Sequence, residues 1–145
     1  MFTRIDHIGI AVPDLDEAKR FYESTFGMRV THEETNEDQG VREAMLAPGP
    51  DTAGDAGAEI QLMAPARQDS AIAKFLERSG PGIHQVAFTV DDIDREQATL
   101  LARGLRLAYP EARRGTAGTR VNFIHPKDAG GVLVELVEHA EATDR

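Results

Sequence analysis

The sequence predicts an α+β fold in which two tandem βαβββ modules form a cupped, barrel-like mixed sheet with the helices outside. Two observations predict this class: the chain contains an internal repeat, and each copy shows a strand pattern, a helical pattern and three further strand patterns. The copies cover about residues 4–64 and 82–138. A chain of 145 residues suits a single domain, residues 1–145, built from two small halves.

Four pairs of segments carry the repeat, and they follow the same order in both halves. Their offsets lie between 74 and 78 residues. The matched segments are 7–12 with 85–90, 26–30 with 103–107, 40–48 with 118–126, and 60–62 with 134–136. Each match is short, but four matches at nearly one offset are hard to obtain by chance. We therefore expect the chain to follow the same path twice.

The first half begins with a strand and a helix. Residues 8–12 alternate bulky and small side chains, as a half-buried strand does. Asp14 is placed to cap the N-terminus of the helix, with Glu17 three residues later, and Gly27 is placed to end it. Three more strands are expected near 28–34, 41–47 and 58–63.

The second half follows a linking helix at about 69–79, capped by Asp69 or Ser70. Gly104 is placed to end the helix of this half. Its last three strands are expected near 105–109, 119–125 and 132–138. Two segments fall outside the pattern: DTAGDAGA at 51–58 predicts a turn-rich loop, and the polar tail EATDR at 141–145 predicts a frayed end.

Composition excludes several classes of protein. Sixteen Lys and Arg against 25 Asp and Glu give a net charge of −9, which argues against nucleic acid or a membrane surface as partner. The absence of cysteine excludes disulfides and thiolate chemistry. No apolar run is long enough to span a membrane, and no signal peptide is visible. We therefore expect a cytoplasmic protein.

Four polar residues are predicted to share one side of the sheet. Successive strand residues face opposite ways, so His7 and its repeat counterpart Gln85 should point away from the helices. Gln61 and Glu135 interrupt the apolar last strand of each half at equivalent places. One imidazole nitrogen and three oxygens would suit Co²⁺, Mn²⁺, Ni²⁺, Mg²⁺ or Zn²⁺.

Other interpretations of these residues remain open at this point. A bulge at Gly82 or Ile83 would turn His84, rather than Gln85, towards the predicted metal. A single histidine or glutamate on a strand is also commonly a hydrogen-bonded or solvent-facing residue that binds no metal.

Glu43 marks an asymmetry, because the repeat places Val121 at its counterpart. On an inward-facing strand, burial would raise the pKa of this carboxyl group and suit it to act as a proton-transfer base. The alternative is a surface glutamate paired with Arg42. Gln39 and Lys127 are weaker candidates for contacts with substrate, Lys127 through a phosphate group.

Several stretches together show a family resemblance: DHIGIAV, NEDQGVREAML, EIQLMAPARQDSAIAKFL, GIHQVAF, FIHPKD and GVLVELV. The chain resembles the vicinal oxygen chelate superfamily of glyoxalases, bleomycin resistance proteins and dioxygenases over nearly its whole length. Within it, these stretches are similar to the methylmalonyl-CoA epimerases. The runs from Glu37 to Leu46 and from Gln61 to Leu76 are the most specific.

The resemblance implies an isomerase that epimerises (2R)- and (2S)-methylmalonyl-CoA, or a close malonyl thioester, through a metal-stabilised enolate. It implies a divalent metal, with Co²⁺ as the first expectation, bound by His7, Gln61, Glu135 and a residue of the fifth strand. Related epimerases have a histidine at that position, where this chain has Gln85. The resemblance also implies Glu43 as catalytic base, Glu135 as its partner, an acyl-CoA substrate and a homodimer.

Three other activities occur on the same fold. A glyoxalase-type lyase or isomerase typically uses two carboxylate ligands, whereas the set here contains only Glu135. A ring-cleaving dioxygenase would need two histidines and one carboxylate, which requires His84 to turn inward. A metal-free binding or resistance protein would need no ligands and would be unaffected by a chelator. The preferred malonyl thioester, for example ethylmalonyl-CoA, is left open.

Overall fold

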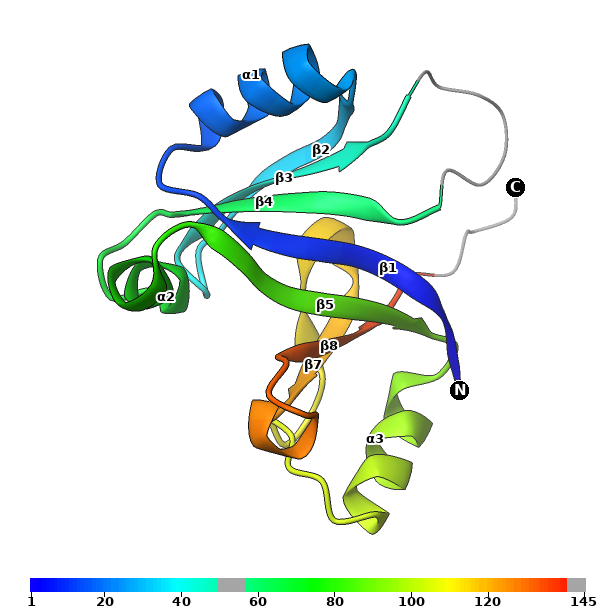
Figure 1. The fold of residues 1–145 in the computed structure, drawn as a ribbon. Coiled ribbons are helices and arrows are strands. Elements are labelled where there is room, and N and C mark those ends of the chain that lie inside the picture. The colour runs from blue at the N-terminus through cyan, green and yellow to red at the C-terminus, as the bar shows by residue number, and fades with distance from the viewer. Residues whose placement is uncertain (50–56, 141–145) are drawn as a thin grey trace. The chain divides into compact units, whose positions relative to one another are not determined.

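The structure is a computed structural model that describes residues 1–49 and 57–140. The predicted tail at 141–145, and all but the last two residues of the predicted loop at 51–58, lie outside this range. The longer elements, shown in Figure 1, are β1 (Phe2–Ala11), α1 (Leu15–Phe26), β2 (Arg29–Asn36), β3 (Val41–Ala47), β4 (Glu59–Pro65), α2 (Ala71–Ser79), β5 (Gly82–Val90), α3 (Ile93–Ala102), β7 (Arg120–Ile124) and β8 (Val134–Glu138). The short elements are β6 (Arg113–Arg114) and two single-turn 3₁₀ helices, Thr116–Gly118 and Pro126–Asp128.

The chain divides into two compact units. The N-terminal unit is His7–His84, and the C-terminal unit combines Met1–Asp6 with Gln85–Arg145. Strands are ordered β2-β3-β4-β1 in the first and β5-β8-β7-β6 in the second. Each order combines one parallel pair, β1 with β4 or β5 with β8, with antiparallel neighbours. The predicted α+β class and the twofold βαβββ path are confirmed.

In the N-terminal unit, α1 covers one face of the sheet. The side chain of Asp14 accepts the backbone N–H of Glu17 at 3.0 Å, and Gly27 ends the helix with a φ of 66°. Leu15 of the helix packs with Leu46 of β3 and Leu62 of β4 in an apolar cluster. This is the arrangement that the alternating pattern of the first half predicts.

The opposite face of the same unit is covered at one end by α2. The side chain of Ser70 caps this helix by accepting the N–H of Ala73 at 3.1 Å. Ile72 then packs against Ala11, Val41 and Met63, which belong to three different strands. The sequence predicts this helix only as a linker, but its apolar side contributes to the core.

In the C-terminal unit, α3 covers one face of the sheet. The opposite face carries a second, smaller apolar cluster. Ile93 of the helix packs with Val90 and Leu136. The side chains of Ala87, Val121 and Val137 form the apolar cluster of the opposite face. Every helix among the described residues is too short or too polar to span a membrane, and the cytoplasmic location remains a prediction.

The prediction of a strand at 105–109 is largely wrong. Leu107 forms only an isolated bridge to Ile124, and the two-residue strand β6 lies later in the chain. Pro110 has no backbone N–H and cannot continue the ladder. The backbone N–H of Tyr109 instead donates to the side chain of Asn122 at 3.1 Å.

Candidate functional site

Glu43 and Gln61 form a buried polar pair in the N-terminal unit. The Gln61 Nε2 donates to Glu43 Oε2 at 3.1 Å, and Glu43 is only 3% exposed. An amide NH₂ group can only donate, so the Glu43 oxygen is the acceptor. The surface alternative for Glu43 is wrong, because Arg42 points outward with its guanidinium 3.6 Å from Asp16.

His7 lies on the same face of the sheet as this pair. The parallel register pairs Gly9 with Gln61, and His7 is two residues before Gly9 on β1. Side chains two residues apart on a strand share a face, so His7 and Gln61 point to the same side. His7 is buried. In this unit the structure therefore places His7, Gln61 and Glu43 on one face of the sheet, as the period of two predicts for His7 and Gln61.

Gln85 and Glu135 form the matching pair in the C-terminal unit. The Gln85 Nε2 donates to Glu135 Oε1 at 2.6 Å, and both side chains are buried. The parallel register aligns Ala87 with Glu135, which places Gln85 on the same face. This face also carries the apolar cluster of Ala87, Val121 and Val137.

His84, the alternative metal ligand, lies against α2 in the N-terminal unit. Its ring packs edge-on against Phe75, with ring centroids 4.9 Å apart and an interplanar angle of 82°. Alternation along β5 turns neighbouring side chains to opposite faces, so His84 faces away from the side of Gln85. The contact with Glu135 is made by Gln85.

Val121 occupies the place of Glu43 in the second copy of the repeat. It is 2% exposed and packs in a cluster of aliphatic side chains. The C-terminal unit therefore has no carboxylate at this position. The predicted asymmetry between the two halves is present in the structure.

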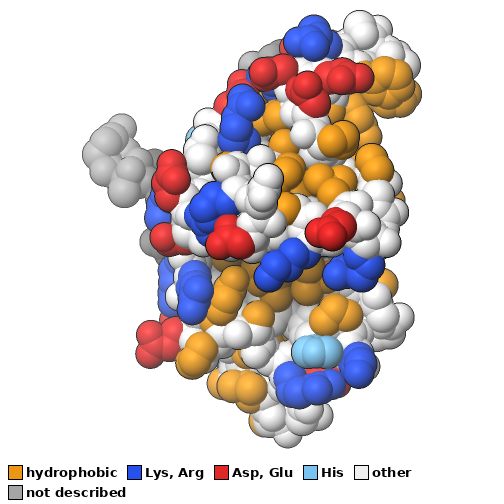
Figure 2. All heavy atoms as spheres, turned by 90° about the vertical axis from the view of Figure 1, so that its left-hand side faces the viewer, with side chains coloured by type: hydrophobic (Ala, Val, Ile, Leu, Met, Phe, Trp, Pro, Cys, Tyr) orange, Lys and Arg blue, Asp and Glu red, His pale blue; other side chains and the backbone are white. Residues whose placement is uncertain are grey.

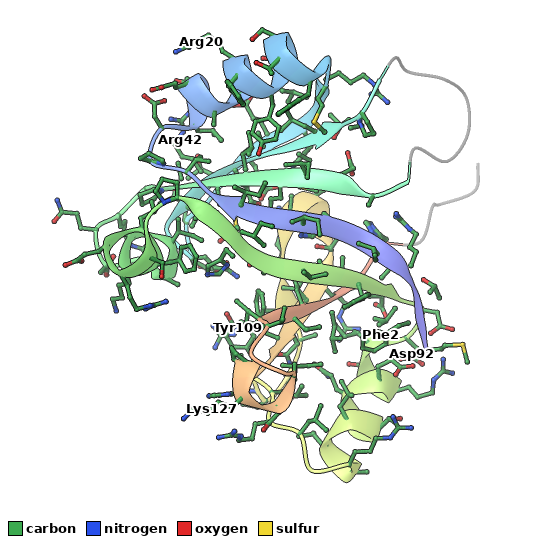
Figure 3. The ribbon with its side chains drawn as sticks, viewed as in Figure 1. Phe2, Arg20, Arg42, Asp92, Tyr109 and Lys127 are labelled. Atoms are coloured by element: carbon green, nitrogen blue, oxygen red, sulfur yellow. The ribbon has the colours of Figure 1, made fainter. Side chains whose placement is uncertain are left out.

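The two weaker candidates lie at turns. Gln39 is half-buried before β3, and its backbone N–H donates to Asn36 Oδ1 at 3.1 Å. Lys127 belongs to the 3₁₀ turn after β7, and its side chain points away from the unit (Figure 3). Among the described residues, neither side chain forms a hydrogen bond or ion pair with the buried pair of its own unit.

Sequence reasoning missed a buried aspartate in the C-terminal unit. Asp6 accepts the Thr89 hydroxyl at 2.7 Å and also pairs with the His139 ring. His139 lines a cavity of about 420 Å³ together with Arg120 and Glu138. Asp6 and His139 are 133 residues apart, so no local pattern in the sequence indicates their contact.

The residue types of the predicted ligand set suit a divalent cation. Carboxylate and amide oxygens with an imidazole nitrogen are ligands that Mg²⁺, Mn²⁺, Co²⁺ and Zn²⁺ accept. Within residues 1–49 and 57–140, no three His, Cys, Asp or Glu side chains form a metal-binding group. The predicted set of His7, Gln61, Gln85 and Glu135 differs from such a group because two of its members are glutamines.

Residues 6–123 match the model of the glyoxalase/bleomycin resistance protein/dioxygenase superfamily. The chain belongs to this superfamily. This match confirms the superfamily that the sequence resemblance predicted. More specific relatives are similar to the chain over nearly its whole length.

Three relatives are named as epimerases. The crystal structure of methylmalonyl-CoA epimerase from Mycobacterium tuberculosis is 57% identical with a TM-score of 0.89, and the match covers 96% of this chain and 89% of that one. A Streptomyces coelicolor methylmalonyl-CoA epimerase in complex with 2-nitronate-propionyl-CoA is 48% identical with a TM-score of 0.90, covering 97% and 99%. The ethylmalonyl-CoA/methylmalonyl-CoA epimerase of Cereibacter sphaeroides is 38% identical, covering 94% of this chain and 98% of that protein. The resemblance to methylmalonyl-CoA epimerases is confirmed.

Proposed function

We propose that this protein is an isomerase that epimerises methylmalonyl-CoA, or a close malonyl thioester such as ethylmalonyl-CoA, at C2. The observation that carries the proposal is the buried carboxylate of Glu43, oriented by Gln61. The named epimerases, matched over nearly the whole chain, support the substrate class.

Epimerisation requires a proton to leave C2 from one face and another to return on the opposite face. In this proposal Glu43 accepts the C2 proton and becomes a neutral carboxylic acid. Gln61 is a positioning residue, because its amide holds the Glu43 oxygen without touching C2. General bases placed in this way accelerate proton transfer by about 10²- to 10⁴-fold.

A second acid must supply the returning proton. The repeat offers no second copy of Glu43, because Val121 stands at that position. Glu135 is the candidate, as a buried carboxyl group that accepts a hydrogen bond from Gln85. In the proposed cycle Glu43 removes the proton from one face of C2, and Glu135, or a water beside it, delivers a proton to the opposite face.

A divalent metal is part of the proposal, with His7, Gln61, Gln85 and Glu135 as its ligands. Bound there, it would stabilise the negative charge that develops on the thioester oxygen as the enolate forms. Co²⁺ is the first ion to test, followed by Mn²⁺, Ni²⁺, Mg²⁺ and Zn²⁺. Gln85 supplies an oxygen where the resemblance leads us to expect a histidine nitrogen.

The experiment is exchange of the C2 proton of methylmalonyl-CoA in D₂O, followed by NMR or mass spectrometry, with Co²⁺ or with EDTA. Fast deuterium uptake that EDTA abolishes is the expected result. Metal binding without uptake would contradict the epimerase proposal and direct the assays to hemithioacetal substrates of glyoxalase type. The absence of both would favour a metal-free binding protein.

A homodimer is a further part of the proposal. Phe21 and Phe26 of α1 are 53% and 58% exposed, and their rings pack edge-on 5.6 Å apart. Exposed aromatic side chains of this kind are enriched at protein–protein interfaces. Sedimentation equilibrium at micromolar concentration should give twice the mass of the chain, and a monomer would contradict this part.

A further inference from the structure

In the C-terminal unit, Arg113 is paired with no carboxylate that the structure describes. Three other arginines of the unit lie in ion pairs, Arg95 with Asp91, Arg106 with Asp128, and Arg120 with Asp94, whereas Arg103 forms none with a described residue. Arg113 forms no salt bridge with the residues that the structure describes. Its guanidinium instead lies over the ring of Tyr109, with Cζ 3.9 Å from the ring centroid. The group therefore keeps its full charge and its N–H donors for an anion.

A buried network fixes the position of Tyr109. Asn122 is completely buried, and its amide is used at both ends. Its Oδ1 accepts the Tyr109 N–H at 3.1 Å, while its Nδ2 donates to the Tyr109 carbonyl at 3.0 Å and to Gln97 Oε1 at 2.6 Å. Burying an amide is costly unless its hydrogen bonds are made, and here they hold the Tyr109 backbone. The ring under Arg113 thus stands on a rigid support.

Arg113 shares a face of the sheet with Glu135. The antiparallel registers pair Arg113 with Val121 and Phe123 with Glu135. Residues directly opposite in such a pair point to the same side, and Val121 and Phe123 are two residues apart on β7. The Tyr109 ring lies edge-on to Phe123 at 6.2 Å. One continuous surface therefore leads from Glu135 over Phe123 and Tyr109 to the Arg113 guanidinium.

We infer that this surface binds the CoA part of the substrate, with Arg113 pairing with its phosphate groups. The inference rests on the proposed function, which places the acyl group at Glu135. The pantetheine arm would then cross Phe123 and Tyr109, with its methylene and methyl groups against the rings. The phosphates would reach a guanidinium that can bind them bidentately. The protein carries a net charge of −9 and should therefore repel the negatively charged CoA. The positive charge of Arg113, on the same face as Glu135, would offset this repulsion locally.

The surroundings of Arg113 agree with an anion site. Figure 2 shows Lys, Arg and hydrophobic side chains interspersed with Asp and Glu on the face that it presents. Figure 3 places Tyr109 and the exposed Lys127 on the same side of the C-terminal unit. Lys127 also forms no salt bridge with a described residue, and would add to the positive potential.

The direct test is calorimetric titration of CoA and of adenosine 3′,5′-bisphosphate into the wild type, Arg113→Gln and Arg114→Gln. Arg114 is the matched control, because it neighbours Arg113 on β6 and faces the other side. Arg113→Gln should weaken both affinities by about 10-fold or more, the value of a charge-assisted hydrogen bond. Arg114→Gln should change them little.

Tyr109→Leu should weaken CoA binding by less than Arg113→Gln does, because it removes only the aromatic ring under the guanidinium. Equal affinities in the wild type and Arg113→Gln, or an equal loss in Arg114→Gln, would overturn the inference.

A second experiment separates this inference from the proposed function. Deuterium exchange is measured on methylmalonyl-CoA and on the truncated thioester methylmalonyl-pantetheine. Arg113→Gln should raise the KM for the CoA thioester about 10-fold with kcat unchanged, and leave exchange on the pantetheine thioester as in the wild type. Equal losses on both substrates would contradict a phosphate contact. CoA binding that depends on Arg113, without exchange in the wild type, would retain this site and refute the epimerase activity.

Discussion

The two units contain the same chemical pair, a glutamine amide that donates to a buried carboxylate, but they build it from different strands. In the N-terminal unit the amide is Gln61 on β4 and the carboxylate is Glu43 on β3. In the C-terminal unit the amide is Gln85 on β5 and the carboxylate is Glu135 on β8. The repeat therefore preserves the backbone and the face on which polar groups lie. Single substitutions at equivalent positions decide which strand carries the acid.

Replacing Glu43 with glutamine should have the largest effect, because it removes the proposed base and keeps its size. We expect deuterium exchange at C2 to fall by about 10²- to 10⁴-fold. Binding of Co²⁺ and CoA should remain close to wild type, since neither contact is assigned to Glu43. An exchange rate within a few-fold of the wild type would show that the base lies elsewhere.

Introducing the missing carboxylate into the second copy, by Val121→Glu, should destabilise the protein. Val121 is packed by Ala87 and Val137, and its methyl groups approach the backbone at Gly115. A buried carboxylate there should cost about 3 kcal/mol or more, and lower Tm by roughly 5 to 12 °C. Val121→Ala is the control, because it leaves a cavity without a charge. If both variants melted at the same temperature, the cost of burying the charge would be refuted.

The equivalence of His7 and Gln85 can be tested through metal binding. Titration with Co²⁺ should show a loss of about 10- to 100-fold in affinity for His7→Ala, Glu135→Ala and Gln85→Ala. Gln85→His should retain or improve the affinity, because it restores an imidazole on the same face. His84→Ala is the matched control and should bind as the wild type does. A loss in His84→Ala combined with normal binding in Gln85→Ala would reverse the assignment.

How far the sequence predicts these features depends on the range of the interactions. Alternation along a strand is local, so it predicted correctly that His7 and Gln61 share a face, whereas for Glu43 it left a surface position open. The choice of hydrogen-bond partner is not local: Gln61 pairs with Glu43, 18 residues away, and Gln85 with Glu135, 50 residues away. Periodicity cannot rank such partners, because it carries no information about which strands are neighbours. The same limit hid the contact between Asp6 and His139.

The strand predicted at 105–109 shows a different limit. Its apolar pattern is that of a strand, and the backbone N–H of Ala108 does donate to the Phe123 carbonyl at 2.8 Å. Pairing ends at Tyr109, where Pro110 follows and the Asn122 side chain takes the backbone N–H. A side chain that replaces a ladder partner is invisible in a hydrophobic pattern. It is also what fixes the aromatic ring beneath Arg113.

The smallest expected effect is at the surface of the C-terminal unit, where Arg106 and Asp128 form an ion pair. Hydrogen bonds from the Arg106 guanidinium and backbone N–H lower the pKa of Asp128 to about 2. The ordinary pKa of an Asp carboxyl group is 3.8, so ionised Asp128 stabilises the fold above that pH, and this contribution is lost as pH falls through about 2. Asp128→Asn should therefore lower Tm slightly at pH 7, and the difference from the wild type should shrink as pH approaches 2. Because the Arg106 side chain is 59% exposed, high salt should also reduce the difference. A difference that stayed constant from pH 7 to pH 2 would show that Asp128 acts through the shape of the turn and not through its charge.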